Sequence, residues 1–252
     1  MTVTHSPGLP EGTDVPNIEF RSDVTVELVR SSAHDSDVLF AARVSTKGEQ
    51  SLEDVEADAE RSKGLINFLM RSHHGTPYEH NSMTFYVHAP IFVFREHMRH
   101  RIASYNEESG RYRELQPVFY VPGPDRKLVQ EGKPGHYTFV EGTADQHELV
   151  DAETRRVCTE AYAAYRRMLA AGVAREVARI VLPLTIYSSM YVTFNARSLM
   201  NFLSLRTRRD DAAFPSFPQR EIEMVAEQME AHWARLMPLT HAAFETNGRV
   251  AP

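Results

Sequence analysis

The chain has 252 residues, 42% of them hydrophobic and 25% charged, which is typical of a soluble globular protein. Its formal net charge of −6 argues against non-specific nucleic-acid binding, because that binding needs cations that neutralise many phosphates. A single cysteine excludes an internal disulfide. The sequence contains neither a signal-peptide pattern nor an apolar run of the ~20 residues that cross a membrane. We therefore expect a cytoplasmic protein that binds neither nucleic acid nor membrane.

The N-terminal half is predicted to alternate between strands and helices. Residues 1–23 contain three prolines and two glycines and are expected to form a flexible tail. Alternating apolar residues predict strands at 24–29 and 81–88. Helical patterns occupy 37–44, with Asp35 or Ser36 as the cap, and also 52–71 and 90–100. The segment 73–80, rich in histidine, is predicted to be a turn, and 99–112 a polar loop.

The C-terminal half is predicted to be mainly helical. Residues 119–126 are expected to be extended, and the Gly-rich segment 128–145 to be an exposed excursion. Helices are predicted at 148–171, 175–182, 195–205 and 219–237, and one strand at 184–194. Asn195 is suited to cap the third of these helices, and 206–218 reads as a charged loop.

These elements predict an α+β fold, with α/β as the mixed alternative. The expected architecture is a small central, mainly antiparallel sheet packed against several long helices. The sequence has no internal repeat and no break in composition. We therefore expect a single catalytic domain over residues 24–252, preceded by the tail.

Six histidines lie between residues 73 and 100, where they could serve as metal ligands. His97 and His100 are three residues apart and would share a helix face. However, the sequence has neither an HExxH motif nor the Glu-x-x-His pairs of di-iron proteins. Arg99 and Arg101 would also repel a dication. No metal site is predicted.

Covalent and nucleotide-loop chemistries lack their usual markers. Cys158 lies within a predicted helix and is expected to be a structural thiol. Ser104 or Ser109 would need an activating base such as His74 or His100. The Gly-x-Ser-x-Gly, P-loop and Gly-x-Gly-x-x-Gly motifs are absent, which disfavours serine hydrolases, P-loop kinases and Rossmann dehydrogenases.

Arginines in separate segments point instead to the recognition of an anion. The stretch 99–112 reads RHRIASYNEESGRY and mixes guanidinium groups with hydroxyl, amide and carboxylate groups. Arg is suited to a two-pronged grip on phosphate or carboxylate. Arg179 and Arg206 add cations on predicted helices. Taken alone, Arg206 is equally well explained as a cation at a helix C-terminus, worth ~0.3–1 kcal/mol.

The stretch RHRIASYNEESGRY resembles the signature of the flavin-dependent thymidylate synthases. The matching positions are Arg-His-Arg, Ser, Asn-Glu, Ser and Arg-Tyr. Further segments resemble the family in the same order: ARVS at 42–45, HGTPYEH at 74–80, REVARIVLP at 175–183 and NARSLMNFLSLR at 195–206. Together they cover most of the chain, from about 24 to 244.

The resemblance implies an enzyme that methylates dUMP to dTMP. Methylenetetrahydrofolate would supply the carbon, and FAD reduced by NADPH would supply the hydride, with tetrahydrofolate released. Activation of the substrate would be electrostatic, with Arg206 as the catalytic residue beside the uracil ring and no cysteine nucleophile. The resemblance also implies a homotetramer whose active sites are shared between chains.

The resemblance also implies two sets of site residues. The dUMP set is Glu96, His97, Met98, Arg99, Glu107, Glu108, Ser109, Gly110, Arg111, Arg179 and Arg206. The FAD set is Ser45, His74, Thr76, Arg99, His100, Arg101, Glu107, Asn195, Ala196, Arg197 and Asn201. Three features depart from the family pattern: Glu96 stands where Gln is more usual, the segment 207–218 is longer, and the tail before Val24 resembles an addition.

Two alternatives differ from this interpretation. One is a folate- and flavin-dependent uracil methylase that acts on RNA, which a product assay with free dUMP would distinguish. The other is a non-enzymatic nucleotide-binding module that uses the Arg and aromatic residues near Tyr105 and Tyr120. The negative net charge disfavours that module, and a bound yellow chromophore would exclude it.

Overall fold

The computed structural model describes residues 17–48, 59–133 and 136–252. The chain divides into two compact units. The first holds the described part of Met1–Ser22 together with Glu108–Ser188, and the second holds Asp23–Glu107 together with Ser189–Pro252. The single catalytic domain expected over 24–252 stays a prediction.

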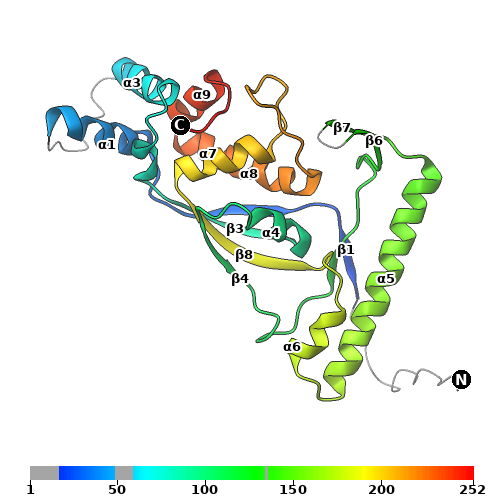
Figure 1. Cartoon of the computed structure of the whole chain (residues 1–252). Helices are drawn as coiled ribbons and strands as arrows, with labels where there is room; N and C mark the ends of the chain where they lie inside the picture. Colours follow the sequence, from blue (N-terminus) through cyan, green and yellow to red (C-terminus); the bar gives the residue numbers. More distant parts are fainter. Residues whose placement is uncertain (1–16, 49–58, 134–135) are drawn as a thin grey trace, which may run out of the picture. The chain divides into compact units, whose positions relative to one another are not determined.

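The second unit is built on a four-stranded sheet of order β2–β3–β8–β4 (Figure 1). The strands are β2 (Thr25–Ser31), β3 (Met83–Pro90), β4 (Ser104–Glu107) and β8 (Tyr187–Phe194), the last beginning in the first unit. β2 pairs antiparallel with β3, and β4 pairs antiparallel with β8. In β3, buried and half-buried residues alternate from Met83 to His88, as expected for a strand that packs one face on a core. This sheet and its helices confirm the predicted α+β class.

Helices pack against this sheet and complete the core of the second unit. They are α1 (Asp35–Lys47), α3 (Ala59–Arg71), α4 (Ile91–His97), α7 (Ala196–Arg206), α8 (Arg220–Leu236) and α9 (Pro238–Thr246), with the 3-10 turn η1 (Thr76–Glu79). α8 packs against β2, α4, α7 and α9. Its Trp233 is fully buried, as are Phe202 of α7 and Phe244 of α9. These aromatic side chains join the helices in one apolar core.

A side chain of α8 pairs with the free edge of the sheet. The Gln228 Oε1 atom accepts from the Val26 N–H group at 3.1 Å, and its Nε2 donates to the Val24 carbonyl at 3.1 Å. Both valines are buried, so these backbone groups would otherwise be costly to leave without partners. The Gln228 side chain therefore supplies the hydrogen bonds that a neighbouring strand would make to this edge.

The first unit is organised around the long helix α5. Its elements are β1 (Glu19–Arg21), β5 (Val118–Tyr120), β6 (Val129–Lys133), β7 (His136–Val140), α5 (Ala144–Ala170), α6 (Arg175–Ala178) and the 3-10 turn η2 (Arg179–Val181). β1 and β5 pair in parallel, and β6 and β7 form an antiparallel hairpin. Thr143 begins α5 with a capping box that also uses Gln146.

The structure corrects several predicted elements. Residues 19–21, which were assigned to the flexible tail, form β1, because Phe20 packs against Phe119 and lies under the Arg155 guanidinium. The expected excursion 128–145 contains the β6–β7 hairpin. The expected loop 99–112 contains β4. Residues 1–16 of the tail and 52–58 of the predicted helix lie outside the described residues.

The cap of α1 and the existence of α9 were also missed by the sequence interpretation. His34, rather than Asp35 or Ser36, caps α1, and Asp37 completes the capping box. Asp35 instead caps the N-terminus of α9. Its carboxylate accepts from the N–H groups of Leu239 and Thr240, each at 2.9 Å, and from the Thr240 Oγ1 at 2.6 Å. An anion at a helix N-terminus is favourable, so this contact joins α1 to α9. No helix in the described ranges is long and apolar enough to span a membrane.

We predict that Asp35→Ala lowers the free energy of unfolding by about 2–3 kcal/mol, because it leaves the buried first turn of α9 without its acceptor. Urea unfolding at fixed protein concentration measures the change. The exposed Asp211 is the control, and Asp211→Ala should change the free energy by less than about 0.5 kcal/mol. Equal losses for the two variants would contradict the role given to Asp35.

Candidate functional site

Arg206 is placed by the helix that it ends. α7 begins at Asn195, whose side chain accepts from the Ser198 N–H group at 2.9 Å, while the Ser198 hydroxyl accepts from the Asn195 N–H group at 3.2 Å. This capping box confirms the predicted cap. The helix is buried through Leu199, Phe202 and Leu203. Its C-terminal end, with Arg206, is therefore fixed against the core of the second unit.

The Arg206 guanidinium is held by two residues from the end of α4 and the turn that follows. Its Nε donates to His100 Nε2 at 3.0 Å, one terminal nitrogen lies 2.6 Å from a Glu96 carboxylate oxygen, and the other lies 3.5 Å from the Glu96 carbonyl. The side chain is only 18% exposed. Because guanidinium carries five N–H groups, donors remain for a ligand. Glu96, whose role was open from the sequence, is thus the ion-pair partner of Arg206.

This geometry fixes the protonation state of His100. Its Nε2 accepts a hydrogen bond from an arginine, so this nitrogen carries no proton and the neutral ring keeps its hydrogen on Nδ1. Burial, and then the positive charge of Arg206, lower the pKa of His100 to about 4. At neutral pH His100 therefore acts as a fixed acceptor that orients Arg206.

His97, in the predicted dUMP set, has its side chain in the core. The ring is fully buried, lies stacked on Phe202 with centroids 4.5 Å apart, and meets Tyr105 edge-on. Neither ring nitrogen has a hydrogen-bond partner. Arg95 on α4 is exposed. Because His97 is two residues further along the same helix, it lies on the opposite side, which faces the core. The side chain thus faces the core, and the place of His97 in the dUMP set stays a prediction.

Predicted FAD residues from two distant segments meet at Gly75. An added Cβ there would lie 2.5 Å from the Arg197 guanidinium carbon and 2.6 Å from the Pro252 carbonyl oxygen, so only glycine fits this position. Arg197 donates from Nε to that Pro252 oxygen at 2.6 Å and pairs with Glu79 at 2.5 Å. The structure therefore brings His74 and Thr76, which flank Gly75, close to Arg197.

The remaining predicted FAD residues offer a donor set that suits an anionic cofactor. Arg99 and Arg101 are exposed, and neither forms an ion pair within the described part of the chain. Ser45, His74 and Asn201 are exposed as well. Free guanidinium groups beside hydroxyl, imidazole and amide groups match the charge and polarity of a diphosphate. All residues of the predicted FAD set belong to the second unit.

Other members of the two sets are committed elsewhere. Ala196 is fully buried, and its N–H group donates to Asn81 Oδ1 at 2.8 Å, so its side chain does not face a ligand. Glu107 lies in β4 opposite Met190. Glu108 forms an ion pair with Arg113 at 2.8 Å. Met98 is partly exposed just after α4.

The first unit brings together a second cluster of predicted dUMP residues. Gly110 is buried, and an added Cβ would lie 3.3 Å from the Arg179 side chain. The Arg111 backbone N–H group donates to the Ser109 hydroxyl at 3.3 Å, and its guanidinium lies 2.8 Å from Glu176. Arg179 is exposed, with no ion pair to a described residue. Hydroxyl and guanidinium donors of this kind suit a phosphate.

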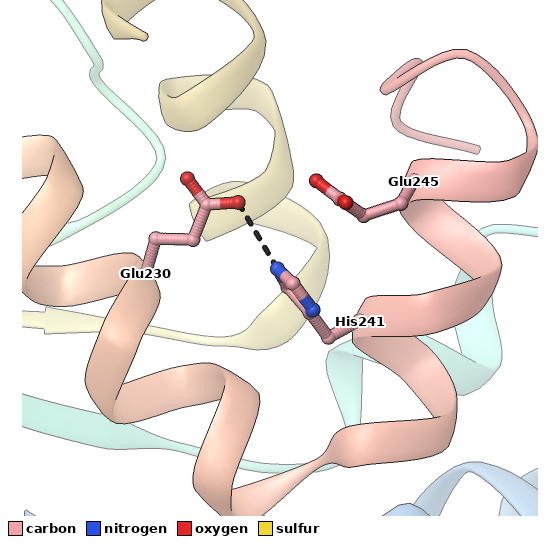
Figure 2. Close-up of side chains that lie close together, drawn as sticks. All are labelled: Glu230, His241 and Glu245. Atoms are coloured by element: carbon pink, nitrogen blue, oxygen red, sulfur yellow. Dashed lines mark hydrogen bonds and ion pairs between the residues drawn. The ribbon is translucent and has the colours of Figure 1, made fainter.

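A polar cluster that the sequence did not indicate lies between α8 and α9 (Figure 2). Glu230 faces His241 and Glu245, and the His241 Nε2 atom lies 3.0 Å from a Glu230 oxygen. The burial of Glu230 is offset by hydrogen bonds from His241 and Arg249, so the pKa of Glu230 falls to about 2. His241 and Glu245 are four residues apart on α9, whereas Glu230 lies on α8, and α9 was not predicted from the sequence.

The comparisons with known proteins agree with these motifs. The model of the family described as thymidylate synthase complementing protein matches residues 27–239. A flavin-dependent thymidylate synthase from Streptomyces coelicolor is 72% identical over 240 residues, which cover 95% of this chain and 98% of the relative. One from Tropheryma whipplei is 61% identical over 233 residues, covering 92% and 97%.

Solved structures match the fold as well. A UMP/dUMP methylase PolB from Streptomyces cacaoi, bound with 5-Br dUMP, has a TM-score of 0.88 and 59% identity, covering 93% of this chain and all of that one. The same protein bound with 5-Br UMP has a TM-score of 0.86 and 58% identity, covering 93% and 99%.

The fold and the match over 27–239 define an α+β enzyme of the thymidylate synthase complementing protein family, to which this chain belongs. The identities of 61–72% place it among relatives named flavin-dependent thymidylate synthase. The family predicted from the motifs is thereby confirmed. Its class is that of an FAD-dependent methyltransferase.

We predict that His97→Phe flattens the dependence of stability on pH. Burial lowers the pKa of His97 to about 3 in the folded protein, against ~6.5 in an unfolded chain. Between these values the unfolded state binds the extra proton, so folding stability falls as the pH is lowered, by up to about 1.4 kcal/mol per pH unit.

Phe keeps the stack on Phe202 and cannot be protonated, so the variant should lose less stability than the wild type between pH 6.5 and 4. Urea unfolding at several pH values measures both slopes. Parallel curves for the two proteins would contradict the buried, uncharged state assigned to His97.

Proposed function

We propose that this chain catalyses the reductive methylation of dUMP to dTMP. Methylenetetrahydrofolate is the carbon donor, NADPH is the reductant, and tetrahydrofolate and NADP are released. Family membership supports the reaction class. The observation that carries the mechanism is the Arg206 guanidinium, held by His100 and Glu96 with N–H groups left for a ligand.

Arg206 is the residue that we assign to activation of the substrate. Carbon C5 of a neutral uracil ring is a poor nucleophile. A fixed cation beside N3 and O4 favours the ring anion and raises the electron density at C5, which is the effect of a nearby charge on a pKa. The neutral His100 and the Glu96 carboxylate hold the guanidinium in one orientation, so no reorganisation is needed during the reaction.

FAD fits the donor set of the second unit. Arg99 and Arg101 would bind its diphosphate, and Ser45, His74, Asn201 and Arg197 would hold its polar edges. Bound FAD, reduced by NADPH, supplies the hydride of the reaction. The chain's own residues bind and orient the reactants.

The phosphate of dUMP is assigned to the cluster in the first unit. Arg179 offers its guanidinium directly, and Ser109 offers a hydroxyl. Arg111 would exchange its contact with Glu176 for the phosphate dianion, a change that costs little because exposed ion pairs are weak. We also propose a homotetramer with active sites shared between chains, and a cytoplasmic location stays a prediction.

A second substrate is favoured by a specific observation. The Streptomyces cacaoi structures describe a UMP/dUMP methylase, bound with 5-Br UMP in one case and 5-Br dUMP in the other. Free UMP is therefore the second candidate substrate, more strongly supported than RNA. Parallel assays with dUMP and UMP, each scored by the methylated product, decide between the two.

We predict that Arg206→Ala keeps bound FAD but lowers the rate of dTMP formation by about 100-fold or more, the size of loss seen when one preorganised donor is removed. FAD absorbance and product analysis measure the two properties. Arg208→Ala is the control, because Arg208 is exposed and pairs only weakly with Asp210 at 3.3 Å. Near-normal turnover by Arg206→Ala would remove Arg206 from the mechanism.

We predict that Cys158→Ala retains turnover within about twofold, because activation is electrostatic rather than covalent. Cys158 is buried on α5, where its Sγ lies 3.3 Å from the Thr185 hydroxyl. Burial raises the pKa of this thiol, which disfavours the nucleophilic thiolate. An inactive variant that still folds would revive a covalent route.

A further inference from the structure

Arg249 is a buried arginine near the end of the chain with an unusual backbone. Its side chain is 4% exposed, and its φ of 58° lies in the left-handed region, which a residue with a Cβ seldom adopts. Such a conformation persists only where the surroundings hold it firmly. Four contacts of its guanidinium supply that hold.

The guanidinium of Arg249 grips Glu230 with both terminal nitrogens. Nη1 lies 2.7 Å from one carboxylate oxygen and Nη2 lies 2.9 Å from the other, the two-pronged geometry of a strong pair. Nη1 also bonds Glu245. The cation stands over the Phe244 ring, 4.9 Å from its centroid.

These contacts decide against a metal in the same place. Glu230, His241 and Glu245 converge as three potential ligands (Figure 2). However, one Arg249 nitrogen already bonds both carboxylates and supplies the compensating positive charge. The cluster is therefore an arginine-centred network, and we infer no metal ion for it.

The fourth contact reaches the residue that follows Arg206. Nη2 of Arg249 donates to the Thr207 Oγ1 at 2.9 Å. The Thr207 hydroxyl in turn donates to the Leu203 carbonyl at 2.8 Å, and its N–H group bonds the same carbonyl at 3.0 Å. Thr207 is 3% exposed. The last turn of α7, which carries Arg206, is thus fastened to a buried cation.

The same C-terminal segment also holds the loop beyond Thr207. The Ala213 N–H group donates to the Gly248 carbonyl at 2.9 Å, and the Ser216 hydroxyl donates to the Thr207 carbonyl at 2.8 Å. Gly248 has a φ of 76°, and an added Cβ would lie 2.9 Å from that of Ala213. The segment 207–218, which is longer than the family pattern, is therefore held by hydrogen bonds at Thr207 and at Ala213.

We propose that Arg249 is a positioning residue for Arg206, acting through Thr207 and Glu230. The inference rests on the proposed function, because it concerns the cation assigned to the uracil ring. Arg249 need not touch the substrate: it fixes the end of α7, so that the Arg206 guanidinium keeps the orientation set by His100 and Glu96. A small displacement of a positioned group costs much activity.

The test isolates the contact between Arg249 and Thr207. Thr207→Val keeps the branched shape of the side chain but removes the hydroxyl, and Thr207→Ser restores it. Each change is made in the wild type and in the Arg206→Ala background, giving a double-mutant cycle. Dissociation constants for dUMP on the FAD-loaded protein are measured by calorimetry, and dTMP formation is measured in parallel.

We expect Thr207→Val to weaken dUMP binding about fivefold in the wild type, and by less than about twofold once Arg206 is absent, since the two residues act as one unit. Thr207→Ser should restore binding, and FAD content should not change. Arg249→Met should behave like Thr207→Val if it folds. Arg209→Met is the matched control, because Arg209 lies 3.6 Å from the same Glu230 carboxylate but bonds Arg208 rather than Thr207.

Equal weakening in both backgrounds, or none in either, would overturn the positioning role. So would an Arg209→Met variant that matches Thr207→Val. A wild type that binds dUMP yet forms no dTMP would instead contradict the proposed function, so the two failures can be told apart.

Discussion

The contact between Arg206 and the neutral His100 ring is the interaction on which the proposed active site depends. An arginine cannot be deprotonated in a protein, so its charge is permanent. The fold must therefore fix the orientation of the Arg206 guanidinium. A ring nitrogen without a proton accepts from Nε, and a carboxylate of Glu96 holds a terminal nitrogen. The guanidinium is therefore fixed while some of its donors stay open, which is the arrangement that electrostatic activation requires.

The orientation of the Arg206 side chain depends in turn on residues that lie far from it in the sequence. Asn195 fixes where α7 begins, and Thr207 fixes where it ends. The Arg249 guanidinium donates to the Thr207 hydroxyl and is itself held by the Glu230 carboxylate of α8. α9 lies between Glu230 and Arg249 in the sequence. The Asp35 carboxylate of α1 accepts a hydrogen bond from the N–H group of Thr240 and so anchors α9. A charged site of this kind needs neutralising partners in the core, because an unpaired buried ion would be strongly destabilising.

The sequence was most informative where the structural signal is local. The caps, periodicity and turn residues of α7 lie within a dozen positions, and Asn195 was correctly assigned as its cap. The strand β2 and the long helix α5 follow from periodicity in the same way. The family motifs likewise consist of short runs of residues around Arg99, His74 and Arg206, so they could be recognised without a fold.

The features that the sequence did not predict depend on contacts between distant residues. β4 is a strand because it pairs with β8, and its own four residues carry little signal. His97 turns into the core, although it stands between the half-buried Glu96 and the exposed Met98, just before the motif. The role of Glu96 becomes visible only when Arg206, 110 positions away, lies beside it. The Arg249 network draws on α7, α8 and α9 together, and no single segment of sequence records it.

The central claim is that a fixed guanidinium favours the anionic form of the uracil ring. The most direct test is a nitrogen NMR titration of dUMP labelled at N3 and bound to the FAD-loaded protein. We expect the pKa of N3 to be lower in the bound nucleotide than in free dUMP, because the anion is stabilised by Arg206. A pKa that is unchanged or raised on binding would contradict it.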